Sequence, residues 1–439
     1  MTEVPGPESL RHFNYEQGFI SPGLQTIATL SKLTIERGEE CILEDVDGNR
    51  FIDFFAGVGV ASLGYNHPRY VRVMQEQVAK VHVGSFTSKH RAELSHLLST
   101  IAVGDLRRTQ YYSSGAEAVE AALRLAKSYT GKSDFMGFWG GFHGKTLGVL
   151  GLLSDDFKHH LGPLPHGVYA TPYANCRHCP FNLSHPDCAW ACVDFIRKKI
   201  RYETTNNIAA LVVEPIQGTA GNVIPPPGYL KELRSLADEI GALLIVDEMI
   251  TGFGRTGKMF GCQHDGVVPD IITIGKGFGG GFPMTGLMSR NEVISAKPFA
   301  NPSGSSSSYG GNPLASAAAY VTLKTIIDDG LVENAATVGA HMLVRLKSFK
   351  EKFPFVGDVR GRGLMIGMEL VKNPHTKEKL DKQFTKMIFQ ECLNRGLIVM
   401  GYNPDIRINP PLVITKEIAD EGIDILEEVF AHVANRINV

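Results

Sequence analysis

The chain has 439 residues, of which 43% are hydrophobic and 21% charged, so it can bury a large core and is too long for one ordinary domain. Its formal net charge of −2, with lysine and arginine spread along the chain, gives no electrostatic reason to bind nucleic acid or an anionic membrane, and we expect small-molecule partners. The first residues are polar, no stretch approaches about 18 uninterrupted apolar residues, and the cysteines are odd in number, so we expect a cytoplasmic protein with free thiols or a metal site rather than disulfides.

The first predicted element is a small β unit. Residues 41–55 place Asp47 and Gly48 between two short apolar runs, which predicts a β-hairpin. Further along, helical stretches such as 116–129 alternate with short apolar runs at 209–216, 242–247 and 271–274. This alternation predicts a mostly parallel sheet covered by helices.

The pattern changes after a loop rich in serine and glycine. Residues 300–311 lead directly into an alanine-rich helix at 313–327, so we interpret them as a functional loop. An amphipathic helix then precedes elements of a compact α+β unit, namely apolar strands near 363–370 and 396–400 and a last helix at 416–438. We divide the chain into an N-terminal segment of a small domain, a large domain, and the C-terminal part of the small domain, with bounds 1–65, 66–330 and 331–439.

An acidic residue and a lysine follow two of the predicted strands. Asp247 ends the run 242–247, and Lys276 lies in a glycine-rich turn just after the run 271–274. Ligands of a parallel α/β sheet bind outside the carboxyl ends of its strands, so both side chains are expected to face one crevice. A lysine there can form a Schiff base with an aldehyde, and a carboxylate can keep a pyridine nitrogen protonated, which are two requirements of pyridoxal phosphate.

A phosphate cradle, the third requirement, is available in the segment 113–117, SSGAE. Hydroxyls and free backbone N–H groups at a helix N-terminus bind phosphate. Taken alone, the segment is better explained as a capping box, because Ser114 is followed three residues later by Glu117.

The segment 139–146, WGGFHGKT, places Phe142 among glycines and next to His143. An aromatic ring in this setting can stack on a planar cofactor. In isolation, a core phenylalanine and a satisfied polar histidine are the simpler interpretation, and the neighbouring motifs favour the cofactor.

Seven motifs occur in order from about residue 40 to about residue 430, including SSGAEAVEAAL, FHGKT, EPIQGTAG, DEMITGFGRTG, the GKG around Lys276, SYGGNPL and IRINPPL. With them the chain resembles the class III family of pyridoxal-phosphate aminotransferases. The resemblance implies an α/β fold of fold-type I, with a large mostly parallel-sheet α/β/α domain and a smaller α+β domain made from the N- and C-terminal segments. It also implies a homodimer with shared active sites and leaves a tetramer open.

The resemblance assigns roles around the cofactor. Lys276 corresponds to the Schiff-base lysine that moves the proton between the substrate's Cα and C4′ of the cofactor, and Asp247 to the partner of the pyridine nitrogen. The ring would lie between Phe142 and Met249, where the family often has valine. The other residues expected to bind the cofactor are His143 and, around the phosphate, Ser114, Gly115 and Ala116.

The same resemblance leads us to expect roles for four more residues. Glu214 in EPIQG matches a catalytic-site glutamate beneath the cofactor pocket, and Arg407 in IRINPPL matches the arginine that binds the substrate's carboxylate through its bidentate fork. Ser308 stands where the family usually has threonine, a residue that reaches the phosphate from the neighbouring subunit. Arg255 is expected to brace its loop rather than to touch substrate.

Three positions depart from the family's pattern. Members that act on 4-aminobutyrate, ornithine or acetylornithine usually have glutamine where this chain has Ile250 and often glutamate where it has Thr219. The 4-aminobutyrate enzymes tend to have arginine in place of Lys145, which is a point charge without the fork. These differences favour the branch that acts on ω-amino acids or amines over a strict 4-aminobutyrate aminotransferase.

A cysteine-rich insertion at 174–193 has four thiols with spacings x2, x8 and x3. A CxxC knuckle with two further thiols suits a structural zinc ion or an iron–sulfur cluster, which could also be shared between subunits. The alternative is an insertion without metal, with His178 and His185 as ordinary surface histidines. The candidate ligands are Cys176, Cys179, Cys188 and Cys192.

The expected reaction is a ping-pong transfer of an amino group from an ω-amino acid, amine or amino acid to a keto acid such as pyruvate or 2-oxoglutarate. The same residues would serve an amino-acid racemase or epimerase of the family, which reprotonates Cα from the opposite face and needs no keto acid. A nucleotide-dependent enzyme is disfavoured because no G-x-x-x-x-G-K-[ST] motif occurs. A catalytically silent paralogue would need neither Lys276 nor Asp247.

Overall fold

Seven short strands form the central sheet of the structure, a computed structural model that describes residues 3–153 and 156–437. Their order across the sheet is β4-β10-β9-β8-β7-β5-β6, and only β10 runs antiparallel to its neighbours. The strands are β4 (Arg108–Tyr112), β5 (Asp134–Phe138), β6 (Val168–Thr171), β7 (Ile208–Val213), β8 (Leu243–Asp247), β9 (Ile271–Ile274) and β10 (Thr285–Ser289).

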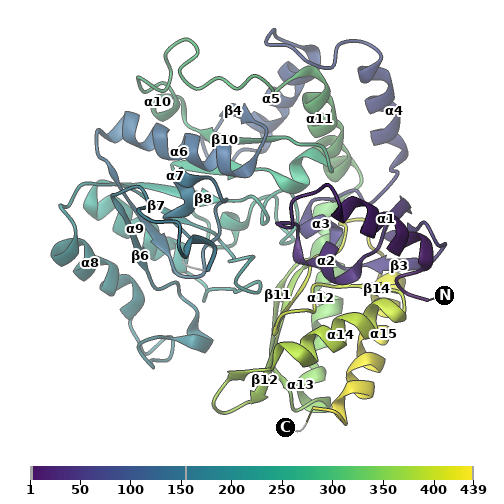
Figure 1. Ribbon diagram of the computed structural model, residues 1–439. Helices are drawn as coiled ribbons and strands as arrows, with labels where there is room; N and C mark the ends of the chain where they lie inside the picture. The colour runs from purple at the N-terminus through teal and green to yellow at the C-terminus, as the bar shows by residue number, and fades with distance from the viewer. Residues whose placement is uncertain (1–2, 154–155, 438–439) are drawn as a thin grey trace.

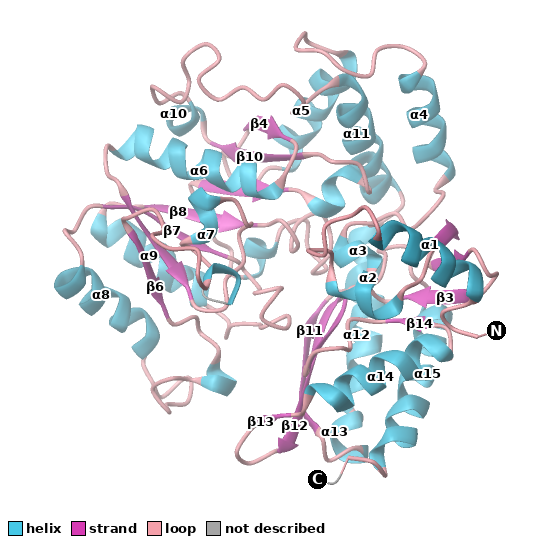
Figure 2. Cartoon of the chain, in the orientation of Figure 1, coloured by secondary structure: helices cyan, strands magenta, loops and turns pink. Residues whose placement is uncertain are grey.

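Helices cover both faces of this sheet (Figures 1 and 2). Strand β8 shows why, because its side chains alternate between two apolar clusters: Leu243 and Ile245 pack into one, and Leu244 and Val246 into the other. Helix α6 (Gly115–Thr130) covers one face and α9 (Tyr229–Ile240) the other. The remaining helices before the C-terminal part are α1 (Pro7–Gln17), α2 (Thr26–Ser31), α3 (Ala56–Gly59), α4 (Pro68–Val78), α5 (Lys89–Ile101), α7 (Leu147–Leu150), α8 (Ala191–Glu203), α10 (Asn291–Ile294) and α11 (Pro313–Asp328), with 3-10 turns η1 (Asp156–Lys158), η2 (Cys176–His178), η3 (Gly261–His264) and η4 (Lys276–Gly279).

Two smaller sheets form the second part of the molecule. The first combines N-terminal and C-terminal segments, because β14 (Leu397–Ile398) pairs in parallel with β3 (Arg50–Asp53), beside β2 (Ile42–Asp45) and β1 (Ile35–Glu39). The second contains β11 (Val356–Arg362), β12 (Met365–Asn373), β13 (Glu378–Lys379) and β15 (Asp405–Ile408). The helices of this part are α12 (Leu331–Lys347), α13 (Phe349–Lys352), α14 (Lys382–Asn394) and α15 (Lys416–Ala434).

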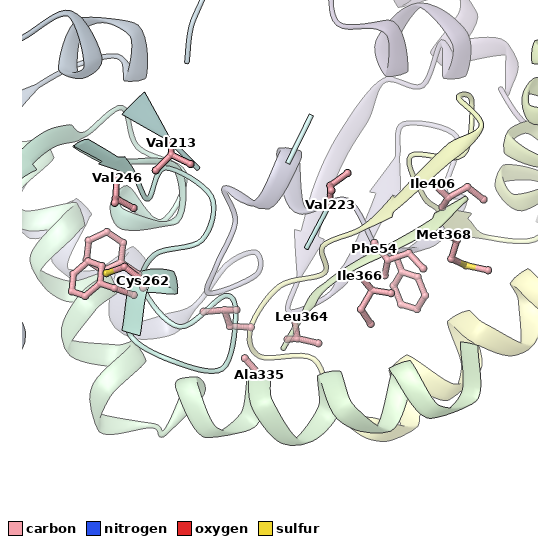
Figure 3. Packing of buried hydrophobic residues seen from close by; sticks show 14 of the residues in the cluster. Phe54, Val213, Val223, Val246, Cys262, Ala335, Leu364, Ile366, Met368 and Ile406 are labelled. Atoms are coloured by element: carbon pink, nitrogen blue, oxygen red, sulfur yellow. The ribbon is translucent and has the colours of Figure 1, made fainter. Parts of the chain in front are cut away.

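One apolar core connects the central sheet to the C-terminal strands. Figure 3 shows Val213 and Val246 on one side and Ile366, Met368 and Ile406 on the other, and all belong to the same cluster of buried residues. Because the cluster is continuous, the two parts of the molecule pack against each other through apolar contacts.

The sequence predictions for the fold are confirmed. The molecule has the expected large, mostly parallel α/β/α domain with a smaller α+β domain that includes both terminal segments. Strand β7 ends at Val213, earlier than the predicted 216, because Glu214 and Pro215 leave the sheet and proline cannot donate to it. The predicted helix 416–438 is shorter than expected, because α15 ends at Ala434, and residue 438 lies outside the described residues. Among the helices of the described chain, none is both long and apolar enough to cross a membrane.

Candidate active site

The predicted site residues of the central sheet all follow the carboxyl ends of strands that run in one direction. The loop after β4 carries Ser114, the loop after β5 carries Phe142 and His143, β7 is followed by Glu214, β8 ends at Asp247, and β9 is followed by Lys276. Parallel strands present their carboxyl ends at one edge of a sheet, which brings these side chains to one place.

Asp247 is held at the centre of this group. It is only 2% exposed, and its Oδ1 accepts hydrogen bonds from the N–H of Met249 and the hydroxyl of Thr273, both at 3.0 Å. Its Oδ2 lies 2.8 Å from Nδ1 of His143, which is equally buried. Burial lowers the pKa of His143, but the hydrogen bond and charge of Asp247, together with the charge of Glu214, raise it above its ordinary value. The carboxylate is thus fixed in orientation by three partners.

Lys276 begins the 3-10 turn η4 in a backbone conformation that lysine seldom adopts, with φ at +47°. Gly275 before it is tightly enclosed, because an added Cβ would lie 2.5 Å from Sδ of Met249 and 2.9 Å from Cγ2 of Thr285. Burial lowers the pKa of the Lys276 amine, the carboxylates of Glu214 and Asp247 oppose this, and Arg407 adds to it, with a net lowering. The lowered pKa favours the neutral amine, which is the nucleophilic form.

The start of α6 satisfies the capping interpretation only in part. Ser114 accepts a hydrogen bond from the N–H of Glu117 at 3.3 Å, but the Glu117 carboxylate accepts from the N–H of Ser113, one residue before the cap. The Ser113 hydroxyl is buried without a partner among the described residues. The first-turn N–H groups of Gly115 and Ala116 have no carbonyl within the helix to pair with.

These features fit a phosphate at the start of α6. An unpartnered hydroxyl and free N–H groups meet at the positive end of a 16-residue helix. Met249 lies between this end and the lysine turn, since its Sδ would be 3.3 Å from a Cβ added to Gly115. The donors therefore suit the phosphate end of the predicted cofactor, and Asp247 and Lys276 suit its ring and aldehyde.

Phe142 and Glu214 are connected directly. The N–H of Phe142 donates to Oε1 of Glu214 at 2.9 Å, and the N–H of Gly218 donates to Oε2 at 3.1 Å. The Phe142 ring is half-buried and makes an edge-to-face contact with Phe157 at 5.7 Å between centroids. Burial raises the pKa of Glu214, the charge of His143 lowers it and that of Asp247 raises it, with a net increase.

Arg407 approaches the same place from the C-terminal sheet. It lies on β15, and its Nη1 donates to the carbonyl of Gly218 at 3.3 Å, its one side-chain hydrogen bond within the described chain. Burial lowers its pKa, which the hydroxyl of Tyr402 and the carboxylates of Glu214 and Asp405 partly offset. The guanidinium therefore keeps most of its donors free for a ligand.

Two of the residues singled out in the sequence, Arg255 and Ser308, lie outside the group around Asp247 and Lys276. Arg255 is 2% exposed and donates to the carbonyls of Leu364 and Pro410, as expected of a residue that braces its loop. Ser308 is exposed on the loop between α10 and α11 and takes no part in the contacts described above.

Thr273 was not predicted as a site residue, and Ser113 was predicted only as part of the phosphate segment 113–117. Thr273 is the polar member of the otherwise apolar strand IITI, which was the available signal for a buried hydroxyl with a specific partner. The sequence placed Ser113 in the phosphate segment, but the lack of a partner for its hydroxyl is visible only in three dimensions.

The four cysteines of the insertion do not fit the predicted metal site. All of them are free thiols, Cys176 exposed and the others half-buried, and within residues 3–153 and 156–437 no group of three or more histidine, cysteine or acidic side chains is arranged to hold a metal ion. The structure gives no support to a zinc ion or an iron–sulfur cluster there.

Comparisons with known proteins agree with this geometry. The family described as aminotransferase class-III matches residues 26–430. An alanine/serine racemase of Pyrococcus horikoshii is 36% identical over 97% of this chain and 91% of its own length, and a 4-aminobutyrate aminotransferase of Mycobacterium leprae is 33% identical over 98% and 97%.

A solved structure gives the same result in three dimensions. An (S)-enantioselective omega-transaminase from Thermomicrobium roseum superimposes with a TM-score of 0.89 and 30% identity, covering 98% of this chain and 99% of its own. The chain belongs to the class III aminotransferase family, whose members include pyridoxal-phosphate transaminases of this fold.

Proposed function

We propose that this protein is a pyridoxal-phosphate-dependent aminotransferase that transfers an amino group from an amino acid, ω-amino acid or amine to a keto acid. The observation that carries the proposal is the meeting of Lys276, with its lowered pKa, and the oriented Asp247 carboxylate at one edge of the central sheet. Membership of the class III family supports it independently.

Pyridoxal phosphate, when bound, supplies an aldehyde that condenses with amines and a ring that accepts electrons from the substrate's Cα. Asp247 would hold the proton on the ring nitrogen, and His143 keeps that carboxylate oriented. Phe142 and Met249 would contact the two ring faces. The phosphate would be bound by Ser114 and by the N–H groups of Gly115 and Ala116.

Lys276 would then act as the acid and base at Cα. Its amine is neutral at a lower pH than that of an ordinary lysine, so it can accept the Cα proton and return it to a neighbouring carbon. Glu214 orients the Phe142 backbone and adds negative charge beside the lysine. Arg407 would bind the carboxylate of the substrate through its free donors.

We propose a homodimer as the working unit. Ser308 is exposed and would reach the phosphate of the partner subunit. The segment between α4 and α5 exposes apolar side chains that a second copy would cover, including Val81, Val83 and Phe86. The domain bounds 1–65, 66–330 and 331–439 are likewise proposed, with the small domain supplying Arg407 to the site.

A racemase is the second candidate, because the Pyrococcus horikoshii relative is an alanine/serine racemase. A racemase requires a second acid or base on the face of Cα opposite Lys276. Position 219, where family members that act on 4-aminobutyrate, ornithine or acetylornithine often have glutamate, is Thr219, whose hydroxyl is not a base near neutral pH. This favours transamination.

The test is an absorbance spectrum of the purified protein with a panel of amino donors, without and then with a keto acid. We expect a visible cofactor band that disappears with a suitable donor, returns with the keto acid, and is absent from Lys276→Ala. A band that persists while the donor loses its chirality would select the racemase. Absence of a band after reconstitution with the cofactor would refute both.

A further inference from the structure

The turn between Cys176 and Cys179 is attached to the C-terminal sheet through a single buried carboxylate. Arg177 and His178, the two residues between these cysteines, both bind Glu369 on β12, through Nε and Nε2 respectively. Lys379 of β13 is a third partner, with its Nζ 2.6 Å from Oε1 of Glu369. Three side chains from two other segments thus meet at the carboxylate of Glu369.

The charge of Glu369 is permanent under ordinary conditions. Its side chain is 1% exposed, and burial alone would raise its pKa, but hydrogen bonds from His178, Lys379 and Arg177 lower the pKa well below the ordinary range. A buried carboxylate that stays ionised depends on its cationic partners, so removal of the carboxylate or of a cation destabilises the folded protein.

Lys379 continues the connection to the strand that carries Arg407. Its Nζ binds both carboxylate oxygens of Asp405, at 2.8 and 2.9 Å. Asp405 lies opposite Glu369 in the pairing of β12 with β15, and Arg407 follows it by two residues. Side chains two residues apart point to the same face of a strand, so Glu369, Asp405 and Arg407 share one face.

The neighbour of Arg407 on that face offers it no support. Gly367 pairs with Arg407 across β12 and β15, and the carbonyl of Gly221 occupies the space that a side chain at position 367 would fill. Arg360 donates to this same carbonyl at 2.7 Å and lies 3.5 Å from Asp405. Backbone pairing with β12 and the hydrogen bond to Gly218 hold Arg407 in place, and on this face of the sheet the ionic contacts of Asp405 are its lateral support.

We propose that Glu369, held by Arg177 and His178, is a positioning residue that sets where Arg407 meets the carboxylate of the substrate. The proposal rests on the proposed function, in which Arg407 binds that carboxylate. It gives the cysteine-rich insertion a role in substrate recognition that requires no metal ion. Loss of the Glu369 charge would release β15 from the insertion and weaken recognition of carboxylates, while capture of carboxylate-free amines would stay the same.

Two small probes separate these effects in the holoenzyme. Aminooxyacetate and methoxyamine carry the same reactive oxyamine group, and only the first has a carboxylate. Both bleach the visible band of the bound cofactor, so their second-order rate constants can be compared without knowledge of the natural substrate. We expect Glu369→Gln to slow aminooxyacetate about tenfold, as a small displacement of a binding group does, and to leave methoxyamine unchanged.

Arg177→Gln should give the same selective loss, because it removes the contact from the insertion's side, and it serves if Glu369→Gln fails to fold. Glu369→Asp keeps the charge and should retain more of the preference for aminooxyacetate than Glu369→Gln does. The matched control is Glu378→Gln, an exposed carboxylate of the same hairpin that binds Lys372 at 3.0 Å, which should alter neither rate.

The outcomes distinguish this proposal from the proposed function. Equal slowing of both probes, or no change in either, in a variant that loads cofactor normally would overturn the positioning role alone. If the native enzyme itself shows no preference for aminooxyacetate, then Arg407 does not bind carboxylates and the positioning role fails, while transamination is still decided by the spectrum with amino donors and a keto acid. Absence of any cofactor band would contradict the proposed function before the probes are used.

Discussion

Lys276 is held in two conditions that a free lysine avoids, burial and a positive φ. Backbone strain of this kind costs on the order of 1–3 kcal/mol and persists only where the surroundings impose it. Here Met249 and Thr285 enclose Gly275 immediately before it. The protein thus gives up stability to hold Lys276 in a place that lowers the pKa of its amine.

Lys276→Met should therefore stabilise the cofactor-free protein near neutral pH. The folded-state pKa of Lys276 is lowered, so below that pKa the folded protein has to bury a charged amine, and the penalty is full. Between that pKa and the unfolded value of about 10.4 only the unfolded chain holds the proton, so the penalty shrinks as pH rises through this range and disappears above it. The gain in the free energy of unfolding should shrink towards alkaline pH. Urea unfolding of both proteins between neutral and alkaline pH measures it, and a gain that is independent of pH would contradict the cause.

Helix α12 fixes the C-terminal sheet against the loop that Arg255 braces. Gly339 in this helix faces Gly363 in the turn between β11 and β12, and a Cβ on Gly339 would collide with the backbone of that turn. Gly363, with φ at +54°, in turn rests on the backbone of Arg255 and Thr256. Helix, turn and loop are stacked with no side chain between them.

Gly339→Ala should consequently destabilise the protein by about 1–3 kcal/mol, although alanine favours an exposed helix by about 1 kcal/mol over glycine. The clash with Gly363 decides the sign. Val344→Ala, on an exposed part of the same helix, should stay within about 0.5 kcal/mol. Chemical denaturation of both variants provides the measurement, and a more stable Gly339→Ala would mean that the turn can move aside.

Local patterns predicted the elements well because each strand and helix has its own signal. The runs 242–247 and 271–274 appear as β8 and β9 almost without change, and the ends of those strands located Asp247 and Lys276. The helix that begins after Ser114 also formed as predicted, since a serine before a helix is visible in the sequence, and its phosphate-binding role stays a prediction. These are features that neighbouring residues determine.

Contacts between distant segments could not be predicted in the same way. In the sequence, Glu369 lies 192 and 191 positions after its partners Arg177 and His178, and each looks like an ordinary surface charge. The four cysteines illustrate the opposite case, because their spacing suggested a metal site, and within the described residues no such arrangement of ligands is found. Spacing constrains local geometry, whereas a binding site also depends on how the segment packs.

At the scale of the whole molecule, the exposed apolar residues require an explanation. Phe86 is 88% exposed, and Val81 and Val83 lie on the same connection between α4 and α5. Exposed apolar side chains grouped on one connection in this way are typical of an interface, and the proposed dimer would bury them.

Phe86→Asp should weaken the dimer and lower cofactor retention together, because the phosphate site is proposed to include Ser308 of the second copy. Tyr202→Asp is the control, since Tyr202 is 74% exposed on α8, away from that segment. Sedimentation velocity with cofactor absorbance detects both changes. A native protein that remains monomeric while it retains full cofactor would exclude the shared site.

The pairing of β14 with β3 has a consequence for how the protein is made. On the ribosome, β3 emerges early, but its parallel neighbour is synthesised only after the central sheet and α12. Until then, the N–H groups of Ile52 and Phe54 lack the carbonyls of Gly396 and Ile398 that accept them in the finished molecule. The nascent chain therefore holds an unfinished β edge through most of its synthesis, and the sheet of β1, β2, β3 and β14 is completed only when translation is nearly finished.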